Sequence, residues 1–170
     1  MDTPLALDTT HLDEMFRVIN DAARAYAGAI PADCYPEPYM PRAELEAEMA
    51  EMRFYGHFVA GRLVGVMGVQ DVQDVTLIRH AYVQTAHQGA GIGTALLRHV
   101  EARAGRDTIL IGTWAAATWA IAFYQAHGYT LVGDRAEKDA LLRQYWHISD
   151  RQVETSVVLR KRVGGVGERR

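Results

Sequence analysis

The sequence predicts an α/β (α+β) fold in which helices flank a central, mixed and mostly antiparallel β-sheet. Helix-forming segments come first in the chain, β-rich runs follow, and strand-like and helix-like segments then alternate. Of the 170 residues, 49% are hydrophobic and 23% are charged, which suits one globular domain with a sizeable core. We expect this domain to span residues 1–163 and residues 164–170 to form a frayed tail.

The N-terminal part of the chain predicts two helices separated by an irregular loop. Apolar residues recur at helical spacing over residues 12–26, and Thr9 or Thr10 is available as the N-cap. The segment 30–41, termed the prolyl loop below, holds four of the five prolines, which prevent regular pairing. Residues 42–52 return to helix-forming types and predict the second helix.

The rest of the chain predicts an antiparallel meander followed by alternating strands and helices. Residues 54–71 contain two β-rich runs separated by Ala60-Gly61-Arg62, and residues 75–84 form a third run. Beyond them, a helix with Ile92, Leu96, Leu97 and Val100 on one face is expected to end near Gly105. The remaining expected elements are a buried strand at 108–114, a helix that ends at Gly128, and closing strands at 129–134 and 153–161 that flank a short helix at 138–146.

The composition disfavours several classes of partner. A formal net charge of −3 and a pI near 6.1 offer no basic excess for a nucleic-acid backbone, so we expect no nucleic-acid partner. The longest nearly apolar stretch, Trp114 to Tyr124, is about half of the roughly 20 residues that cross a bilayer, and the acidic start lacks the basic residues of a signal peptide. We therefore expect a cytoplasmic protein with no membrane partner. The single cysteine, Cys34, allows no internal disulfide, and we expect no metal.

A glycine-rich loop, HQGAGIGT at 87–94, lies between an extended run and a helix. Its alternating glycines let the chain pass close to an anion without Cβ atoms, and the N–H groups at the helix start can converge on that anion. Neither GxxxxGK[ST] nor GxGxxG fits, because no lysine follows the glycines and the third fingerprint glycine falls on Thr94 or Leu96. The alternative is an ordinary tight turn with glycines chosen for packing.

Residues Gln88 to Gly93 fit the pattern Q-x-x-G-x-G and resemble the GNAT superfamily of acyl-CoA-dependent N-acyltransferases. A second motif, AIAFYQAHGY at 120–129, matches the family's helix that ends in a tyrosine and then glycine-aromatic. The resemblance implies one GNAT domain over 1–163, with a twisted sheet of six to seven strands, about four flanking helices, and a splay between the fourth and fifth strands. It also implies an N-terminal strand, which we place at 5–8.

The same resemblance implies acetyl-CoA as the co-substrate. The glycine loop receives the pyrophosphate of coenzyme A, and the strand before it pairs its backbone with the pantetheine arm. Many members carry asparagine seven residues before the family tyrosine, where this chain has Ala117, so we expect one polar contact to the cofactor to be lost. The expected cofactor-binding residues are Ala81, Tyr82, Val83, Gln88, Gly89, Ala90, Gly91, Ile92, Gly93, Thr94 and Tyr124.

Attack of an amine on a thioester needs a proton donor and a proton acceptor. Tyr124 matches the family tyrosine near the sulfur and is the expected general acid, because a phenol can protonate a departing thiolate; its alternative role is a core aromatic. His80 is the first candidate for the general base, and His57 is a weaker one. Strict alternation puts His80 on the face opposite to Ala81, and a β-bulge changes that parity. For both histidines the alternative is a hydrogen-bonded structural role.

The resemblance also implies that the junction of the first two helices forms part of the acceptor site. The carboxylates and aromatic rings of the prolyl loop there suit a cationic amine, and the alternative is a solvated loop followed by an acidic helix face. We therefore predict an N-acetyltransferase that passes the acetyl group of acetyl-CoA directly to a primary amine of a small molecule or peptide in a ternary complex. The alternatives are a non-catalytic CoA-binding sensor or scaffold, and an N-acyltransferase with a longer acyl-CoA. A homodimer is expected by family analogy. The expected substrate-binding residues are Tyr35, Glu37, Tyr39 and His57, and Asp33 belongs to the same loop.

Overall fold

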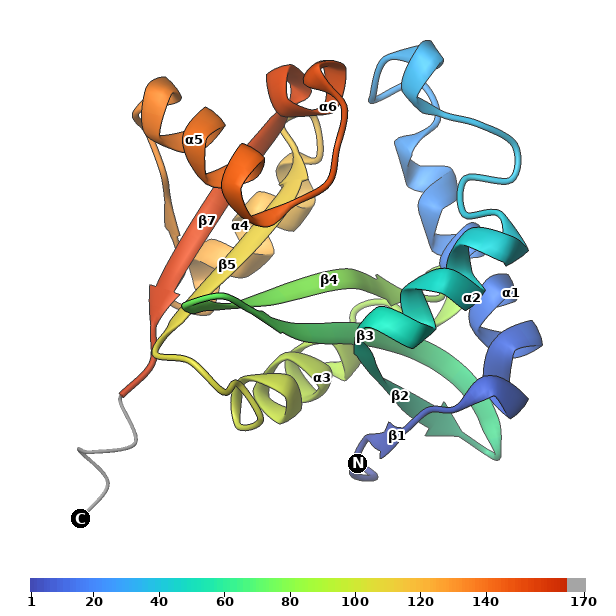
Figure 1. The fold of residues 1–170 in the computed structure, drawn as a ribbon. Helices are drawn as coiled ribbons and strands as arrows, with labels where there is room; N and C mark the ends of the chain where they lie inside the picture. Colours follow the sequence, from blue (N-terminus) through green and yellow to red (C-terminus); the bar gives the residue numbers. More distant parts are fainter. Residues whose placement is uncertain (165–170) are drawn as a thin grey trace.

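The computed structural model describes residues 1–164 and joins seven strands in one sheet of order β1-β2-β3-β4-β5-β7-β6 (Figure 1). Neighbouring strands are antiparallel except β4 and β5, which are parallel, so the sheet is mixed and mostly antiparallel as predicted. Of the predicted tail, residues 165–170 lie outside the described residues. The strands are β1 (Leu5–Ala6), β2 (Arg53–Val59), β3 (Arg62–Val72), β4 (Val75–Val83), β5 (Thr108–Trp114), β6 (Thr130–Leu131) and β7 (Ser156–Arg162).

Six α-helices flank the sheet in the described part of the chain, where about four were expected. The additional helices are α5, which was predicted as the short helix, and α6, which six residues are too few to reveal as a helical period. Within residues 1–164, no helix combines the length and the apolar character that a membrane crossing needs. The helices are α1 (Leu12–Ala23), α2 (Arg42–Glu51), α3 (Ile92–Glu101), α4 (Thr118–Ala126), α5 (Arg135–Tyr145) and α6 (Asp150–Thr155).

Two expected boundaries were wrong for local reasons. Neither Thr9 nor Thr10 caps the first helix: Asp8 accepts a hydrogen bond from the backbone N–H of Thr10 at 2.9 Å and caps a short 3-10 turn, and α1 follows with His11 as its N-cap residue. The predicted last strand begins with a helix instead, because Ser149 and Gln152 form a capping box that starts α6, and β7 begins only at Ser156.

The core divides into clusters on the two faces of the sheet. On one face, α1 and α2 bury Met15, Ile19 and Leu45 against β2 and β3, and α5 and α6 bury a second cluster against β4, β5 and β7. On the other face, α3 and α4 pack on the sheet through residues such as Leu96 and Tyr124. The amphipathic pattern read from the sequence therefore marks the buried sides of α1 and α3.

The sheet opens between β4 and β5, as expected (Figure 1). These strands pair over three residues only, from Thr76 with Ile109 to Ile78 with Ile111, and then diverge. β4 also contains a bulge beyond the last of these pairs, because the register shifts opposite Met67, and His80 there has a φ of 55°. The splay and the bulge together create the edge on which the candidate site is built.

Candidate active site

A row of free backbone amides begins the α3 helix. Gly91 is the N-cap residue of α3, with a φ of 83°, and no side chain caps the helix. Within residues 1–164, the backbone N–H groups of residues 89–94 donate no hydrogen bond to a protein acceptor. A helix N-terminus with so many free donors favours a bound anion. The predicted loop residues thus lie together in an arrangement that fits a diphosphate.

Different constraints explain the glycines of this loop. A Cβ on Gly91 would meet only the Met1 side chain, at 3.5 Å, so space does not require glycine there, but the left-handed φ does. A Cβ on Gly93 would lie 3.3 Å from the Phe123 ring, so this glycine lets α3 approach α4 closely. The packing alternative considered for the loop therefore holds for Gly93, whereas Gly91 shapes the turn that frees the amides.

The edge of β4 beyond Ile78 is unpaired on the side of β5. The N–H of Gln84 donates to the carbonyl of Val64 in β3 at 2.8 Å, so by alternation the backbone groups of Val83 and Ala81 point toward the splay. The side-chain amide of Gln88 donates to the carbonyl of Val83 at 3.0 Å, which ties the glycine loop to this strand end. The edge thus offers backbone partners to an extended ligand next to the amide row.

A cleft of about 370 Å³ lies at the splay and is lined from α2, β4, β5 and α4. Tyr124 of α4 lines it, although the Tyr124 ring also packs edge-on against Phe123 and Tyr129 with centroids 5.3 and 5.9 Å apart. Burial, with a smaller effect of Tyr26, raises the pKa of Tyr124, so the phenol keeps its proton at neutral pH. Tyr124 is therefore a core aromatic that also borders the cleft in its protonated form.

The bulge in β4 brings Arg79 and His80 to the same carboxylate, Glu48 of α2. The Glu48 carboxylate lies 3.3 Å from an Arg79 nitrogen and 3.6 Å from the His80 Nε2, the second distance being too long for a direct hydrogen bond. The His80 ring stacks on Phe54 with centroids 6.0 Å apart, and its Nε2 is buried without a hydrogen-bond partner among the described residues. The bulge thus interrupts the regular alternation of side chains along β4. Such an interruption is what His80 needs to be a candidate base.

Glu48 was not predicted from the sequence. Burial alone raises the pKa of its carboxyl, but His80 and Arg79 outweigh burial and lower that pKa, so Glu48 is ionised at neutral pH. One signal was available, because Glu48 follows the buried Leu45 by three residues and therefore shares its helical face. The expected acidic helix face of α2 is thus partly turned toward the cleft.

The expected acceptor residues are divided by the structure. Tyr39 lines the cleft, and Tyr35 stacks on it with ring centroids 5.8 Å apart. Glu37 is exposed and does not line the cleft. His57 lies in β2 opposite Gly65 and is only 3% exposed, and the structure does not bring it to the cleft. Asp33 forms an ion pair with Arg151 of α6 at 3.2 Å, which links the prolyl loop to the far side of the cleft.

Ala117 takes a buried apolar position where an asparagine was the family expectation. It is fully buried at the N-cap of α4 and packs with Ile30 and Trp114. Without a side-chain cap on α4, this position offers no polar group to a ligand. In the described part of the chain, no group of three or more histidine, cysteine, aspartate or glutamate side chains is arranged to hold a metal ion.

Comparisons with known proteins agree with this geometry. A family model described as an acetyltransferase (GNAT) domain matches residues 20–145. The chain is 31% identical over 134 residues to the mycothiol acetyltransferase of Nocardiopsis dassonvillei, a match that covers 78% of this chain and 40% of that protein. The chain therefore spans less than half the length of this relative.

Solved structures share the fold. The PaiA N-acetyltransferase of Thermoplasma acidophilum, in complex with coenzyme A, matches with a TM-score of 0.71 and 16% identity, over 95% of this chain and 99% of that one. The ribosomal-protein-alanine N-acetyltransferase of Brucella melitensis matches with a TM-score of 0.65 and 16% identity, over 95% of this chain and 100% of that one. At such identities the likeness establishes the fold alone.

Proposed function

The chain belongs to the GNAT acetyltransferases, a family of acyltransferase enzymes, and from this premise we propose that it transfers the acetyl group of acetyl-CoA to a primary amine of a small molecule or peptide. The amine attacks directly, in a ternary complex. One observation carries the proposal: the free amides of residues 89–94 directly follow the open edge of β4, and Tyr124 lines the cleft that begins where β4 leaves β5.

The residues present fit the co-substrate. The amide row of 89–94 would bind the diphosphate, and the backbone groups of Ala81 and Val83 would pair with the pantetheine arm. When bound, acetyl-CoA supplies an acetyl thioester. Ala117 contributes no polar contact, so binding depends on main-chain donors even more than the family pattern implies.

Two side chains at the cleft divide the proton transfers. The amine attacks in its unprotonated form, His80 accepts the proton that its nitrogen loses as the amide forms, and the ionised Glu48 beside His80 stabilises the resulting imidazolium. Tyr124, whose pKa is raised by burial, donates its proton to the departing sulfur. The C–S bond breaks as the C–N bond forms, so one proton enters at His80 and one leaves from Tyr124.

The test is an amine panel with acetyl-CoA. The loss of thioester absorbance is the suitable readout, because disulfide reagents for free thiol would also react with Cys34, which lines the cleft. Coenzyme A binding by calorimetry, with no amine-dependent loss of thioester over the whole panel, would favour the alternative of a sensor or scaffold. A strong preference for longer acyl-CoA in competition would favour the other alternative.

Tyr124→Phe separates catalysis from binding. We expect its kcat to fall about 10²-fold, while the Kd for coenzyme A stays within about twofold. Tyr129→Phe is the matched control, because the Tyr129 hydroxyl is buried without a hydrogen-bond partner among the described residues. Equal turnover of Tyr124→Phe and wild type would reduce Tyr124 to packing.

The homodimer and the cytoplasmic location expected from the sequence stay predictions. Light scattering on the purified chain tests the first, and fractionation of cells tests the second. A monomer at micromolar concentration would contradict the homodimer and leave the acetyltransfer proposal intact, since every residue named for it comes from one chain.

A further inference from the structure

Four aromatic rings form one surface on the acceptor side of the cleft. They are Tyr26, Tyr35, Tyr39 and Tyr82, termed the tyrosine wall, and they come from the 3-10 turn that follows α1, the prolyl loop and β4; Tyr26, Tyr39 and Tyr82 line the cleft, and Tyr35 stacks behind Tyr39. The Tyr39 ring lies 5.2 Å from Tyr26 and 5.8 Å from Tyr35, and the Tyr82 ring lies 6.4 Å from Tyr26. The indole N–H of Trp114 in β5 donates to the Tyr39 hydroxyl at 2.8 Å, which anchors the wall across the cleft.

The tyrosine wall is uncharged and electron-rich. Burial raises the pKa of Tyr26, Tyr39 and Tyr82, so these phenols stay neutral at physiological pH. Neutral aromatic faces attract a cation through the quadrupole of the ring. The wall therefore favours a positively charged ligand. It contains no anionic side chain that could pair with the charge of that ligand.

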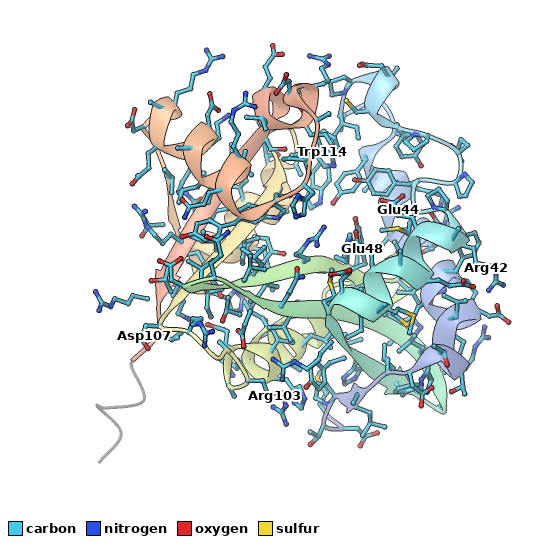
Figure 2. All side chains as sticks on the ribbon, in the orientation of Figure 1. Arg42, Glu44, Glu48, Arg103, Asp107 and Trp114 are labelled. Carbon is cyan, nitrogen blue, oxygen red and sulfur yellow. The ribbon has the colours of Figure 1, made fainter. Side chains whose placement is uncertain are left out.

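Two carboxylates of α2 lie beside the wall, one helical turn apart. Glu44 and Glu48 both line the cleft, and Figure 2 shows them projecting from α2 toward the half of the molecule that carries Trp114. Glu48 forms an ion pair with Arg79, whereas within residues 1–164 no cation forms an ion pair with Glu44. The Glu44 charge lies close enough to Tyr39 to add to the rise of that tyrosine's pKa.

The free carboxylate indicates where a second positive charge would bind. The reacting nitrogen must lose its proton beside His80 and Glu48, so it cannot remain the cation that the wall and Glu44 attract. Side chains one turn apart on a helix have Cβ atoms about 6 Å apart. A linear chain of about four carbons places its two terminal nitrogens about 6 Å apart, because C–C and C–N bonds of about 1.5 Å each advance an extended chain by roughly 1.25 Å.

We propose that the acceptor is a dicationic alkyl diamine, with one nitrogen acetylated beside His80 and the other held between Tyr39 and Glu44. This inference rests on the proposed acetyltransferase function. In the step itself, the unprotonated nitrogen forms a C–N bond with the acetyl carbon as the C–S bond breaks. His80 takes the proton of that nitrogen, Tyr124 gives one to sulfur, and the distal ammonium keeps its charge.

The test compares amines of one length that differ only at the far end. They are 1,4-diaminobutane, 1-aminobutane and 4-aminobutanoate, with 2-phenylethylamine added as an aromatic acceptor. We expect kcat/KM for the diamine to exceed that for 1-aminobutane about tenfold, and 4-aminobutanoate to be the poorest. Equal values for the diamine and 1-aminobutane, or a preference for 2-phenylethylamine, would overturn the proposal.

A pair of variants locates the second charge. Glu44→Gln is expected to reduce the preference for the diamine over 1-aminobutane by about fivefold. Glu46→Gln is the matched control, because it removes the same charge from an exposed position of α2 that does not line the cleft. If the preference is retained in Glu44→Gln, or lost equally in both variants, the site assigned to the distal nitrogen is wrong.

The outcomes separate this inference from the function on which it rests. Acetylation of several amines without a preference for the diamine contradicts the inference and leaves the acetyltransferase proposal standing. Coenzyme A binding with no acetylation of any amine contradicts both. Calorimetric titration of each variant with coenzyme A shows whether it is folded, so a loss of preference is not mistaken for a loss of structure.

Discussion

The two sides of the cleft differ in the groups that form them, which are main-chain groups on one side and side chains on the other. The cofactor side consists of main-chain groups, namely the amides of 89–94 and the open edge of β4, and its side chains are small. The acceptor side consists of side chains, namely the tyrosine wall, the two carboxylates of α2 and His80. Under the proposed function, the first side would recognise a feature that all acyl-CoA molecules share, and the second would distinguish one amine from another.

This difference explains why glycine matters on one side and not on the other. A main-chain site is destroyed by a single Cβ or a wrong φ, because each amide must point at the same anion. A site of side chains loses its contacts one at a time, so most substitutions there change rate or preference by a limited factor. The predictions below test this contrast from the largest expected effect to the smallest.

Gly91→Val is expected to have the largest effect. A valine at a φ of 83° is strained, and its side chain would stand where the diphosphate approaches the amides of α3. Calorimetric titration should show coenzyme A affinity reduced by at least about 10²-fold. Gly133→Val is the control, because that glycine has open space around it and lies outside the loop. Unchanged coenzyme A affinity in Gly91→Val would show that the amides of 89–94 do not bind the diphosphate.

His80→Asn is expected to affect turnover and leave the cofactor side intact. Asparagine tolerates the left-handed φ of 55°, so the bulge is kept while the proton acceptor is lost. We expect kcat/KM for an amine to fall about 10²-fold, with coenzyme A affinity unchanged. His147→Asn serves for comparison, since His147 is an exposed histidine that also lines the cleft. A similar loss in both variants would argue against His80 as the base.

Glu48→Gln tests how much the charge of Glu48, which lies beside Arg79 and His80, contributes to stability. The folded-state pKa of Glu48 is lowered, so its contribution to stability is present above the ordinary carboxyl pKa of about 4.3 and is lost as pH falls through the lower folded value. In urea unfolding at neutral pH, the free energy of unfolding of wild type should exceed that of Glu48→Gln by about 1 kcal/mol. That difference should shrink toward zero as the pH falls through the lowered folded-state pKa of Glu48. A difference independent of pH would mean that the charge is not the cause.

Arg151→Ala is expected to have the smallest effect. Arg151 and Asp33 are exposed, and salt screens such a pair, so their ion pair holds the prolyl loop to α6 only weakly. We expect KM for the amine to rise about twofold at low salt and coenzyme A affinity to stay the same. Arg143→Ala removes an ion pair within the α5–α6 segment, with Asp150, and should leave both unchanged. A parallel loss of coenzyme A affinity in Arg151→Ala would show that the two sides are coupled.

The same contrast limits what the sequence could predict. The loop at 88–93 was predictable, because alternating glycines before a helix are a local pattern, and the splay and the position of Tyr124 followed from the resemblance to the GNAT superfamily that the loop and the helix-terminal motif support. Glu48 and the tyrosine wall were not, because they join α1, α2, the prolyl loop and β4 through tertiary packing. His80 lies between these cases: its role depended on a bulge, and only the register of β3 with β4 shows one.

Only three residue pairs join β4 to β5, so the sheet consists of two half-sheets that are connected along a narrow seam, namely these three pairs. A pantetheine arm paired along residues 79–83 would lie at the open edge of β4 as an added strand. The bound co-substrate would then help to hold the two half-sheets together. Amide hydrogen exchange in β4 beyond Ile78 and in β5 beyond Ile111 should therefore slow together on uptake of coenzyme A.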